Sequence, residues 1–288
     1  TLADALKVPI FVTLQGDDVF LDALPEADRQ ACGELIARNL ERCAGTIATS
    51  RFYADHMRSY LGLSGAPTHV IPPGINLKGH GGETEYRTEP PFRIGYFARI
   101  APEKGFHNLV DAYLRYRTLP DAPPAKLYAS GWLGENNRRY FDEQVAKLRA
   151  AGIASDFEYV ESKDHAAKVR FLRSLDILSV PTDFLEPKGL YILEAWANGV
   201  PVVQPAHGSF PELIEATGGG KLVTPNDLDA LARGWKELLA DPAKRKELGE
   251  RGRNAVQESY TAERMAEATA QWLAAHPQTP QRPQTPAV

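Results

Sequence analysis

Residues 180–204, VPTDFLEPKGLYILEAWANGVPVVQ, decide the fold and the function that we predict for this chain. They begin at the end of an apolar run, 177–180, which predicts a buried strand. A polar turn with Glu186 follows, and a helix predicted over 189–198 then carries Glu194. A second apolar run comes after the helix, so the stretch predicts a strand–loop–helix–strand unit of a parallel sheet.

The start of this helix is a predicted anion site. The first turn of a helix leaves backbone N–H groups without partners inside the helix and carries the positive end of the helix dipole. Gly189, Leu190 and Tyr191 occupy this turn, and phosphate groups bind at such positions. Glu186 before the helix and Glu194 within it add hydrogen-bond acceptors. The stretch therefore predicts a ligand that carries both phosphate and sugar hydroxyl groups.

Glu186 and Glu194, with seven residues between them and AWANGVPVV at 195–203 after them, resemble the Glu-x7-Glu signature of retaining glycosyltransferases of family 4. The resemblance implies the GT-B fold, an α/β fold of two Rossmann-like domains with parallel sheets. It covers nearly all of 9–275, and we expect the first domain to be incomplete, with a missing part upstream of Thr1. The alternative is two solvated glutamates without a function.

Length and composition are those of an ordinary globular protein with about two domains. The 288 residues are 43% hydrophobic and 24% charged, with a net charge of −4, so nothing predicts nucleic acid as a partner. No apolar run reaches the roughly 18 residues of a membrane span. Cys32 and Cys43 lie on one predicted helix, too far apart for a disulfide. We expect both thiols to be buried and inert, in a cytoplasmic protein. Peripheral contact with a membrane is compatible with this expectation.

Strand–helix alternation runs through the chain in two series, which predicts two parallel sheets. The first series has strands at 8–14, 45–49 and 69–71, and helices at 25–43 and 51–60, the latter capped by Ser50. The second has strands at 92–98, 126–130, 156–160, 177–180, 202–204 and 221–223, and helices at 107–116, 138–151, 166–174, 189–198, 211–216, 228–239 and 242–258.

These series define the expected domains. We predict a partial acceptor-side domain over 1–75, a linker over 76–91, and a complete Rossmann-like nucleotide-sugar domain over 92–260. A helix over 261–275 crosses back to the first domain, as the resemblance implies. The Pro- and Gln-rich tail over 276–288 is expected to be disordered.

Arg99 and Lys104 follow the predicted strand 92–98 in the run ARIAPEKGF. Two cations and a glycine at the end of a strand suit a diphosphate, because Arg binds phosphate bidentately and Lys acts as a point charge. The run resembles the family's G-R-x4-K-G diphosphate motif, with Ala98 in the position of the first Gly. The alternative is a surface Arg and a Lys paired with Glu103.

Less specific patterns complete the predicted donor site. Gly131, after the strand 126–130, would let a nucleotide approach closely. The resemblance implies that the loop with Ser162 holds the base. Trp132 is expected either in the core or facing a ligand. Lys188 stands where the family usually has Phe, and it would either add a cation near the diphosphate or point to solvent.

Gln15, Gly16 and Asp17 are the predicted acceptor-side residues. They follow the strand 8–14, and open α/β sheets bind ligands at the carboxyl ends of their strands. Asp18 is a further candidate for contact with an acceptor. Gln15 replaces a histidine that the family often uses beside the reacting sugar, and Gln can hydrogen-bond but cannot act as a base. A turn rich in Asp, without a ligand, is the alternative.

The resemblance implies an enzyme that moves a hexose from a UDP-, GDP- or ADP-linked sugar to an acceptor hydroxyl with retention of configuration. The acceptor would be a glycan, a lipid or a small molecule, and no metal ion or further cofactor is expected. The implied catalytic residues are Arg99, Lys104 and Glu186; the implied donor-binding residues are Glu194, Gly189, Leu190, Tyr191, Gly131 and Ser162. Alternatives are a nucleotide-sugar-binding module without turnover and another GT-B enzyme, such as a nucleotide-sugar epimerase.

Overall fold

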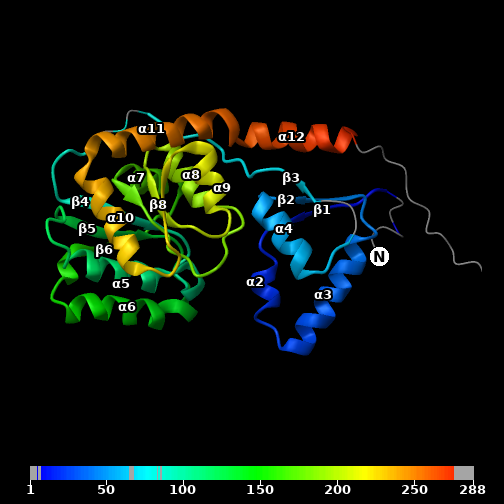
Figure 1. Ribbon diagram of the computed structural model, residues 1–288, viewed down its shortest axis with the longest axis horizontal. Helices are drawn as coiled ribbons and strands as arrows, with labels where there is room; N and C mark the ends of the chain where they lie inside the picture. The colour runs from blue at the N-terminus through cyan, green and yellow to red at the C-terminus, as the bar shows by residue number, and fades with distance from the viewer. Residues whose placement is uncertain (1–4, 6–7, 65–67, 83, 85, 276–288) are drawn as a thin grey trace, which may run out of the picture. The chain divides into compact units, whose positions relative to one another are not determined.

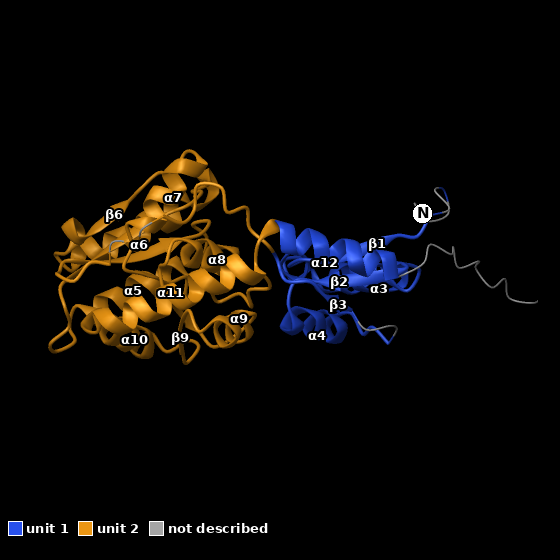
Figure 2. Ribbon diagram, turned by 90° about the horizontal axis from the view of Figure 1, so that it is seen from above, with its two compact units in different colours: residues 1–73, 263–288 blue, residues 74–262 orange. Residues whose placement is uncertain are grey.

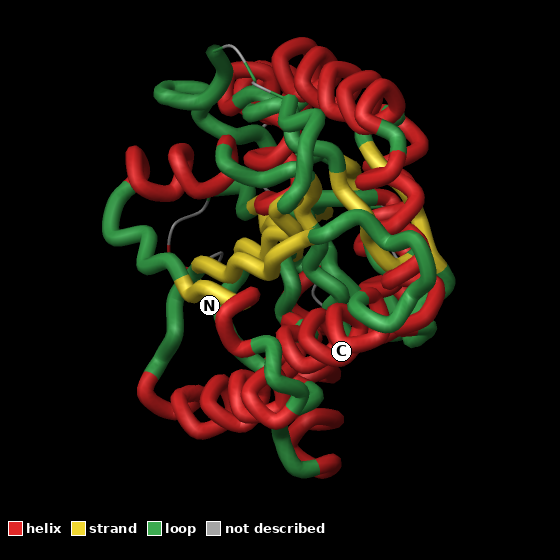
Figure 3. The backbone as a smooth tube through the Cα atoms, turned by 90° about the vertical axis from the view of Figure 1, so that its left-hand side faces the viewer, coloured by secondary structure: helices red, strands yellow, loops and turns green. Residues whose placement is uncertain are grey.

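The computed structural model describes residues 5, 8–64, 68–82, 84 and 86–275, so the predicted disordered tail lies outside the described residues. The chain forms two compact units, which are coloured separately in Figure 2. Unit 1 comprises Thr1–Pro73 and Glu263–Val288, and unit 2 comprises Gly74–Ala262. Figure 3 traces the alternation of strands and helices that the sequence predicts.

Unit 1 is built on a parallel sheet with the order β1-β2-β3. Alternation along β2 sends Ile47 and Ala48 to opposite faces, where they join two separate apolar clusters. Trp272 covers the face of Ile47 and packs its ring edge-on against Phe11, with 5.1 Å between ring centroids. Gly45 is required here, because a Cβ atom would lie 2.6 Å from the Trp272 ring. The elements of this unit are β1 (Phe11–Leu14), α2 (Asp18–Leu21), α3 (Glu26–Leu40), β2 (Gly45–Ala48), α4 (Arg51–Tyr60), β3 (His69–Val70) and α12 (Ala262–Ala275).

Unit 2 contains a six-stranded parallel sheet with the order β6-β5-β4-β7-β8-β9. The chain starts at β4, builds outward to β6, and then crosses over to continue from β7 on the other side of β4. This is the order of a doubly wound sheet, whose switch point lies between β4 and β7. The strands are β4 (Phe92–Phe97), β5 (Ala125–Ser130), β6 (Phe157–Tyr159), β7 (Ile177–Leu178), β8 (Val202–Pro205) and β9 (Gly220–Val223).

Helices cover both faces of this sheet, as the long apolar runs of its strands require. α5 packs against α6 and α10, and α8 packs against α7 and α11 (Figure 1). The helices are α5 (Phe106–Tyr116), α6 (Arg138–Ala150), α7 (His165–Arg173), α8 (Leu190–Ala197), α9 (Phe210–Thr217), α10 (Leu228–Ala240) and α11 (Pro242–Ser259), with short 3₁₀ turns at Pro102–Lys104, Glu135–Asn137 and Ala154–Asp156. The predicted second series of elements is therefore confirmed to within two residues at most boundaries.

Residues 76–91, predicted as a linker, belong to unit 2. The His80 ring hydrogen-bonds the side-chain amide of Asn198 at 2.8 Å, and Thr84 donates to the Asn198 carbonyl at 2.9 Å. Arg87 donates to the Asp176 carboxylate at 3.2 Å. These side-chain hydrogen bonds, together with the packing of Leu77 against the core, attach the segment to the domain.

The end of α3 corrects the prediction for the two cysteines. The helix stops at Leu40, so Cys43 lies beyond it and does not share a helix with Cys32. Both cysteines are free thiols and are only partly buried, not buried as expected. The predicted cap is confirmed, because the Ser50 hydroxyl accepts from the backbone N–H of Tyr53 at 3.1 Å. The described helices include none that is long and apolar enough to cross a membrane.

Arg245 on α11 is fully buried and joins several parts of unit 2. Its guanidinium donates to the carbonyls of Leu238 and Leu239 at 3.3 and 3.2 Å and to the carbonyl of Arg87. It lies 3.9 Å from the Asp176 carboxylate. Without this side chain, these acceptors would be buried with fewer donors, which is costly.

We expect Arg245→Ala to lower the free energy of unfolding by about 3 kcal/mol or more, because it removes the charged donor of three carbonyls and a fully buried side chain. Urea unfolding, followed by circular dichroism, measures this loss. Arg251→Ala on the same helix is the control, since Arg251 is exposed and its ion pair with Glu247 lies on the surface. Its expected loss is below about 0.5 kcal/mol. Equal losses in the two variants would contradict the role of Arg245.

Candidate functional site

The two loops at the switch point of unit 2 are bonded to each other. The loop after β4 carries Glu103, whose carbonyl accepts from the Thr182 hydroxyl at 2.6 Å and from the Phe184 N–H at 3.2 Å, both on the loop after β7. The Asn108 amide on α5 donates to the Pro181 carbonyl at 3.1 Å. These bonds bring the Arg99–Lys104 stretch and the Glu-x7-Glu stretch to one place at the carboxyl edge of the sheet.

Each of these loops enters its helix through a glycine in the left-handed region. Gly105 precedes α5 with φ +67°, and Gly189 precedes α8 with φ +64°. A Cβ atom on Gly105 would lie 1.8 Å from the Pro181 carbonyl oxygen, so no larger residue fits between the two loops. Glycine is therefore needed at the Gly105 junction for both conformation and space.

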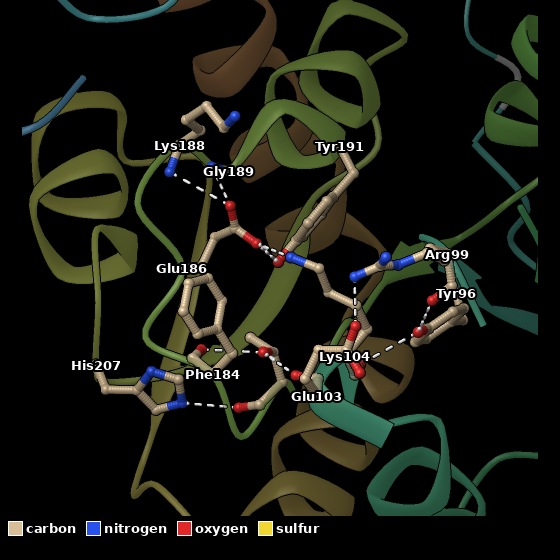
Figure 4. Close-up of polar contacts among 11 residues, drawn as sticks. Tyr96, Arg99, Glu103, Lys104, Phe184, Glu186, Lys188, Gly189, Tyr191 and His207 are labelled. Atoms are coloured by element: carbon tan, nitrogen blue, oxygen red, sulfur yellow. Dashed lines mark hydrogen bonds and ion pairs between the residues drawn. The ribbon is translucent and has the colours of Figure 1, made fainter. Parts of the chain in front are cut away.

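Lys104 and Glu186 form an ion pair between the two loops (Figure 4). The Lys104 Nζ donates to the Glu186 Oε2 at 2.6 Å, and their side chains are 18% and 5% exposed. The Tyr191 hydroxyl donates to the same oxygen at 3.2 Å, and the backbone N–H groups of Lys188 and Gly189 donate to Oε1 at 3.3 Å each. A buried carboxylate with four donors is held in one orientation.

The charge state of Glu186 follows from these contacts. Burial by itself raises the pKa of the Glu186 carboxyl, but the Lys104 ammonium and the backbone N–H groups of Gly189 and Lys188 outweigh it and hold the pKa below its usual value. Burial, reinforced by the neighbouring Glu186 charge, raises the pKa of the Tyr191 hydroxyl well above its usual value. At neutral pH, Glu186 is therefore an anion and Tyr191 a neutral donor.

Arg99 lies on the same loop as Lys104 but has a different partner. Its guanidinium pairs with Glu103, and the alternative pairing of Lys104 with Glu103 is not the one observed. The buried Tyr96 of β4 fixes this loop, since its hydroxyl donates to the carbonyls of Arg99 and Lys104 at 3.0 and 3.2 Å. Arg99 itself is half exposed, and its pairing on the surface leaves it accessible to a ligand.

The side chains at the first turn of α8 point in different directions. Leu190 is exposed and Tyr191 is buried, so only their backbone N–H groups share the helix terminus. The Lys188 ammonium points away from the Glu186 carboxylate in Figure 4, while its backbone N–H binds that carboxylate. Lys188 thus contributes to the site through its backbone.

Glu194, the second acid of the signature, is paired within unit 2. Lys168 on α7 donates to its Oε1 at 2.6 Å, and both side chains are largely buried. No local sequence pattern indicates Lys168 as a site residue, because its partner lies 26 residues away on another helix. Lys168 also lines the cavity described next.

A polar cavity of about 1050 Å³ lies at the carboxyl ends of β4, β5 and β6. Its lining includes Gly131 and Ser162, the two residues predicted from the loops after β5 and β6. The Ser162 hydroxyl hydrogen-bonds the Ser130 hydroxyl at 2.7 Å. Gly131 has φ +130°, and a Cβ atom there would lie 1.9 Å from the Ala98 carbonyl oxygen. Gly131 therefore lets the β4 and β5 loops approach closely.

The predicted acceptor-side residues lie in unit 1, after β1. Gln15 and Asp17 are exposed, and the Gln15 N–H donates to the Asp17 carboxylate at 3.1 Å in a local turn. Asp18, by contrast, is buried: the Tyr53 hydroxyl donates to it at 2.8 Å, and the His56 ring lies at 3.0 Å. The expectation that Asp18 faces an acceptor is wrong, because its carboxylate joins α2 to α4. Gly16 has φ +112°, which lets the chain turn there.

His207 makes a contact that connects two loops of unit 2. The His207 Nε2 hydrogen-bonds the Thr182 carbonyl at 2.9 Å, which ties the turn after β8 to the loop after β7. Among the described residues, no group of three or more His, Cys, Asp or Glu side chains could hold a metal ion.

Comparison with known proteins assigns the chain to a family. The family model for glycosyl transferases group 1 matches residues 84–255, and that for glycosyltransferase family 4 matches residues 1–78. The chain belongs to the glycosyl transferases group 1. The resemblance that the Glu-x7-Glu stretch predicted is thereby confirmed.

The chain is similar in sequence to curated glycosyltransferases. It is 29% identical over 181 residues to the lipopolysaccharide core biosynthesis glycosyltransferase LpsE of Rhizobium meliloti, covering 62% of this chain and 48% of LpsE. It is 27% identical over 186 residues to a GDP-mannose-dependent phosphatidylinositol monomannoside mannosyltransferase of Corynebacterium glutamicum, covering 62% of this chain and 46% of that enzyme. The chain thus spans just under half the length of these two relatives.

Two solved structures illustrate the fold that this chain shares with known proteins. The Anabaena protein HepE, in complex with UDP and glucose, superposes with a TM-score of 0.79 at 19% identity, over 95% of this chain and 73% of HepE. Sucrose-phosphate synthase from Thermosynechococcus elongatus gives a TM-score of 0.76 at 25% identity, over 92% and 67%. The predicted α/β fold of GT-B type is confirmed.

We expect Glu186→Gln to lower the free energy of unfolding at pH 7 by about 1.5 to 3 kcal/mol, the contribution of a hydrogen bond to a charged group. Because the folded pKa of Glu186 lies below the usual 4.5, its stabilisation is complete above pH 4.5 and is lost as the pH falls through the lower folded value. The difference between wild type and variant should therefore shrink with acid. Urea unfolding between pH 3 and 7 measures it.

The control for this pH dependence is Glu215→Gln, at an exposed position on α9. This variant should differ from wild type by less than about 0.5 kcal/mol at every pH. A difference for Glu186→Gln that stays constant from pH 7 to pH 3 would show that the charge of Glu186 does not stabilise the fold.

Proposed function

We propose that this chain binds a nucleotide diphosphate sugar in unit 2 and transfers its hexose to an acceptor hydroxyl, with retention of configuration and without a metal ion. The observation that carries the proposal is the contact of Lys104 with Glu186 at the switch point of a doubly wound sheet, beside the first turn of α8. A cation for phosphate and an acid for hydroxyl groups thus meet at one point. The UDP and glucose bound to HepE support this class of ligand.

The ligand would exchange partners with the ion pair. A diphosphate between Lys104 and the first-turn N–H groups of Leu190 and Tyr191 would take the ammonium from Glu186. The Glu186 carboxylate would then accept hydrogen bonds from the sugar hydroxyls. The pair therefore keeps two charged groups satisfied and in place before the donor binds, which limits the reorganisation on binding.

Electrostatic stabilisation is the catalytic role of the cations. As the bond between the sugar and the diphosphate breaks, negative charge grows on the leaving diphosphate. Lys104, Arg99 and the dipole of α8 would offset this charge. Glu194 would accept from the ribose hydroxyls beside Lys168. Gln15, Gly16 and Asp17 would lie on the acceptor side, where a glycan, a lipid or a small molecule supplies the hydroxyl.

A nucleotide-sugar-binding module without turnover is the second candidate. The observation that favours it is Gln15, which replaces a histidine often used by the family and cannot act as a base. The free thiols of Cys32 and Cys43 support a reducing compartment such as the cytoplasm for either function.

A panel of UDP-, GDP- and ADP-sugars tests binding. Thermal unfolding should shift upward with at least one of them, since a ligand at 100 times its Kd stabilises the folded state by about 2.7 kcal/mol. A radiolabelled transfer assay with the same donor, in the presence of EDTA, then separates enzyme from binding module. No shift with any member of the panel would refute nucleotide-sugar binding, and binding without transfer to any acceptor would favour the module.

We expect Lys104→Ala and Glu194→Ala each to weaken binding of the nucleotide sugar about 10- to 100-fold, because each removes a charge-assisted hydrogen bond. Titration calorimetry measures the affinity, and circular dichroism checks that the variants are folded. Lys147→Ala is the matched control, since Lys147 pairs with Asp111 away from the site. Unchanged affinity in both site variants would reject this site.

A further inference from the structure

Trp132 differs from the other tryptophans of the chain in its exposure. The sequence has 4 tryptophans. Trp196 and Trp235 are 0% exposed and Trp272 is 9% exposed, whereas Trp132 is 67% exposed. Exposing an indole ring forgoes a large hydrophobic stabilisation, and tryptophan is enriched where a protein binds a partner. Packing in the core therefore does not account for a tryptophan at position 132.

The backbone and ring of Trp132 are both held in place. Its carbonyl accepts from the Ile100 N–H at 2.9 Å, next to Arg99 on the loop after β4. The six-membered end of its indole packs against Gly134, where a Cβ atom would lie 2.6 Å from the ring. The absence of a side chain at Gly134 thus makes room for the ring. Trp132 is thus exposed to solvent, while Gly134 and the hydrogen bond from Ile100 hold it in place.

The position of Trp132 follows from the strand order. The acid Glu186 belongs to the loop after β7, and Lys104 belongs to the loop after β4. β5 and β6 lie on the opposite side of β4 from β7. A nucleotide sugar with its sugar at Glu186 and its diphosphate at Lys104 would continue in the same direction along the sheet edge, which carries its nucleoside toward β5 and β6. The cavity of about 1050 Å³ lies there, and Trp132 lines it together with Ser162 and Lys168.

We propose that Trp132 is the platform on which the base of the nucleotide donor stacks. This inference rests on the proposed function, and it assigns a binding role to a residue for which the sequence left core and ligand equally open. Every nucleobase has a π face, so stacking strengthens binding without selecting the base. Trp132 therefore strengthens binding of any nucleoside. Discrimination between bases then depends on the polar groups of the cavity.

Two substitutions and two kinds of ligand test the stacking. Calorimetry compares wild type, Trp132→Phe and Trp132→Leu with UDP, GDP and ADP, and with inorganic pyrophosphate as a ligand without a base. Trp132→Leu should weaken each nucleoside diphosphate that binds about 5- to 150-fold, the range measured when a stacking side chain is removed. Trp132→Phe should stay within a few fold of wild type. The affinity for pyrophosphate should not change in any variant.

Fluorescence gives an independent readout on the unaltered chain. Because the other three tryptophans are buried, acrylamide should quench chiefly Trp132. Saturating nucleoside diphosphate should protect this fluorescence from acrylamide, and pyrophosphate should not. In Trp132→Phe the protected component should disappear. Protection by pyrophosphate equal to that by the nucleotide would overturn the stacking, even if a substituted protein failed to fold.

The outcomes separate this inference from the proposed function. If Lys104→Ala weakens nucleoside diphosphate binding and Trp132→Leu does not, the donor site stands and the stacking fails. If Trp132→Leu weakens nucleotide sugars but not the free nucleoside diphosphates, Trp132 contacts the sugar and the stacking also fails. If wild type binds none of the nucleotides, the proposed function itself fails.

Discussion

The ion pair between Lys104 and Glu186 is the interaction on which the candidate site depends. A carboxylate as buried as Glu186 is stable as an anion only with strong compensation. Backbone N–H groups beside Glu186 supply part of it, but the opposite charge comes from another loop, because Lys104 follows β4 and Glu186 follows β7. The pair thus links the two halves of the doubly wound sheet at the one place where their loops diverge. A ligand that replaces either partner must supply an equivalent charge or hydrogen bond.

Backbone packing fixes the geometry that this pair requires. Gly105 leaves room for the carbonyl of Pro181. The hydroxyl of Tyr96 donates hydrogen bonds to the carbonyls of Arg99 and Lys104. The hydroxyl of Thr182, on the loop after β7, donates a hydrogen bond to the Glu103 carbonyl. Since these contacts involve backbone atoms or buried side chains, they hold the loops without occupying the polar groups that face a ligand. Backbone contacts thus fix the loops of the site, while the charged side chains remain able to change partners when a ligand binds.

Much of the fold could be predicted from the sequence because its signals are local. The helix predicted at 189–198 is α8, Leu190–Ala197, and the cap at Ser50 forms as expected. Partners that depend on tertiary packing could not be predicted. No local pattern connects Lys168 to Glu194 or the Tyr191 hydroxyl to Glu186. The burial of Asp18 also depends on Tyr53 and His56, on a helix 35 and 38 residues further along the chain.

The discontinuity of unit 1 has a consequence for how the chain is made. Unit 2 is one uninterrupted segment, Gly74–Ala262, and contains its whole sheet. Unit 1 takes its sheet from residues that precede unit 2 and Trp272 from a helix that follows unit 2, so Trp272 cannot cover the Ile47 face of that sheet until α12 has been synthesised. Domains fold as their sequences emerge during synthesis. Unit 2 therefore completes its core before Trp272 is available to pack against Phe11 and Ile47.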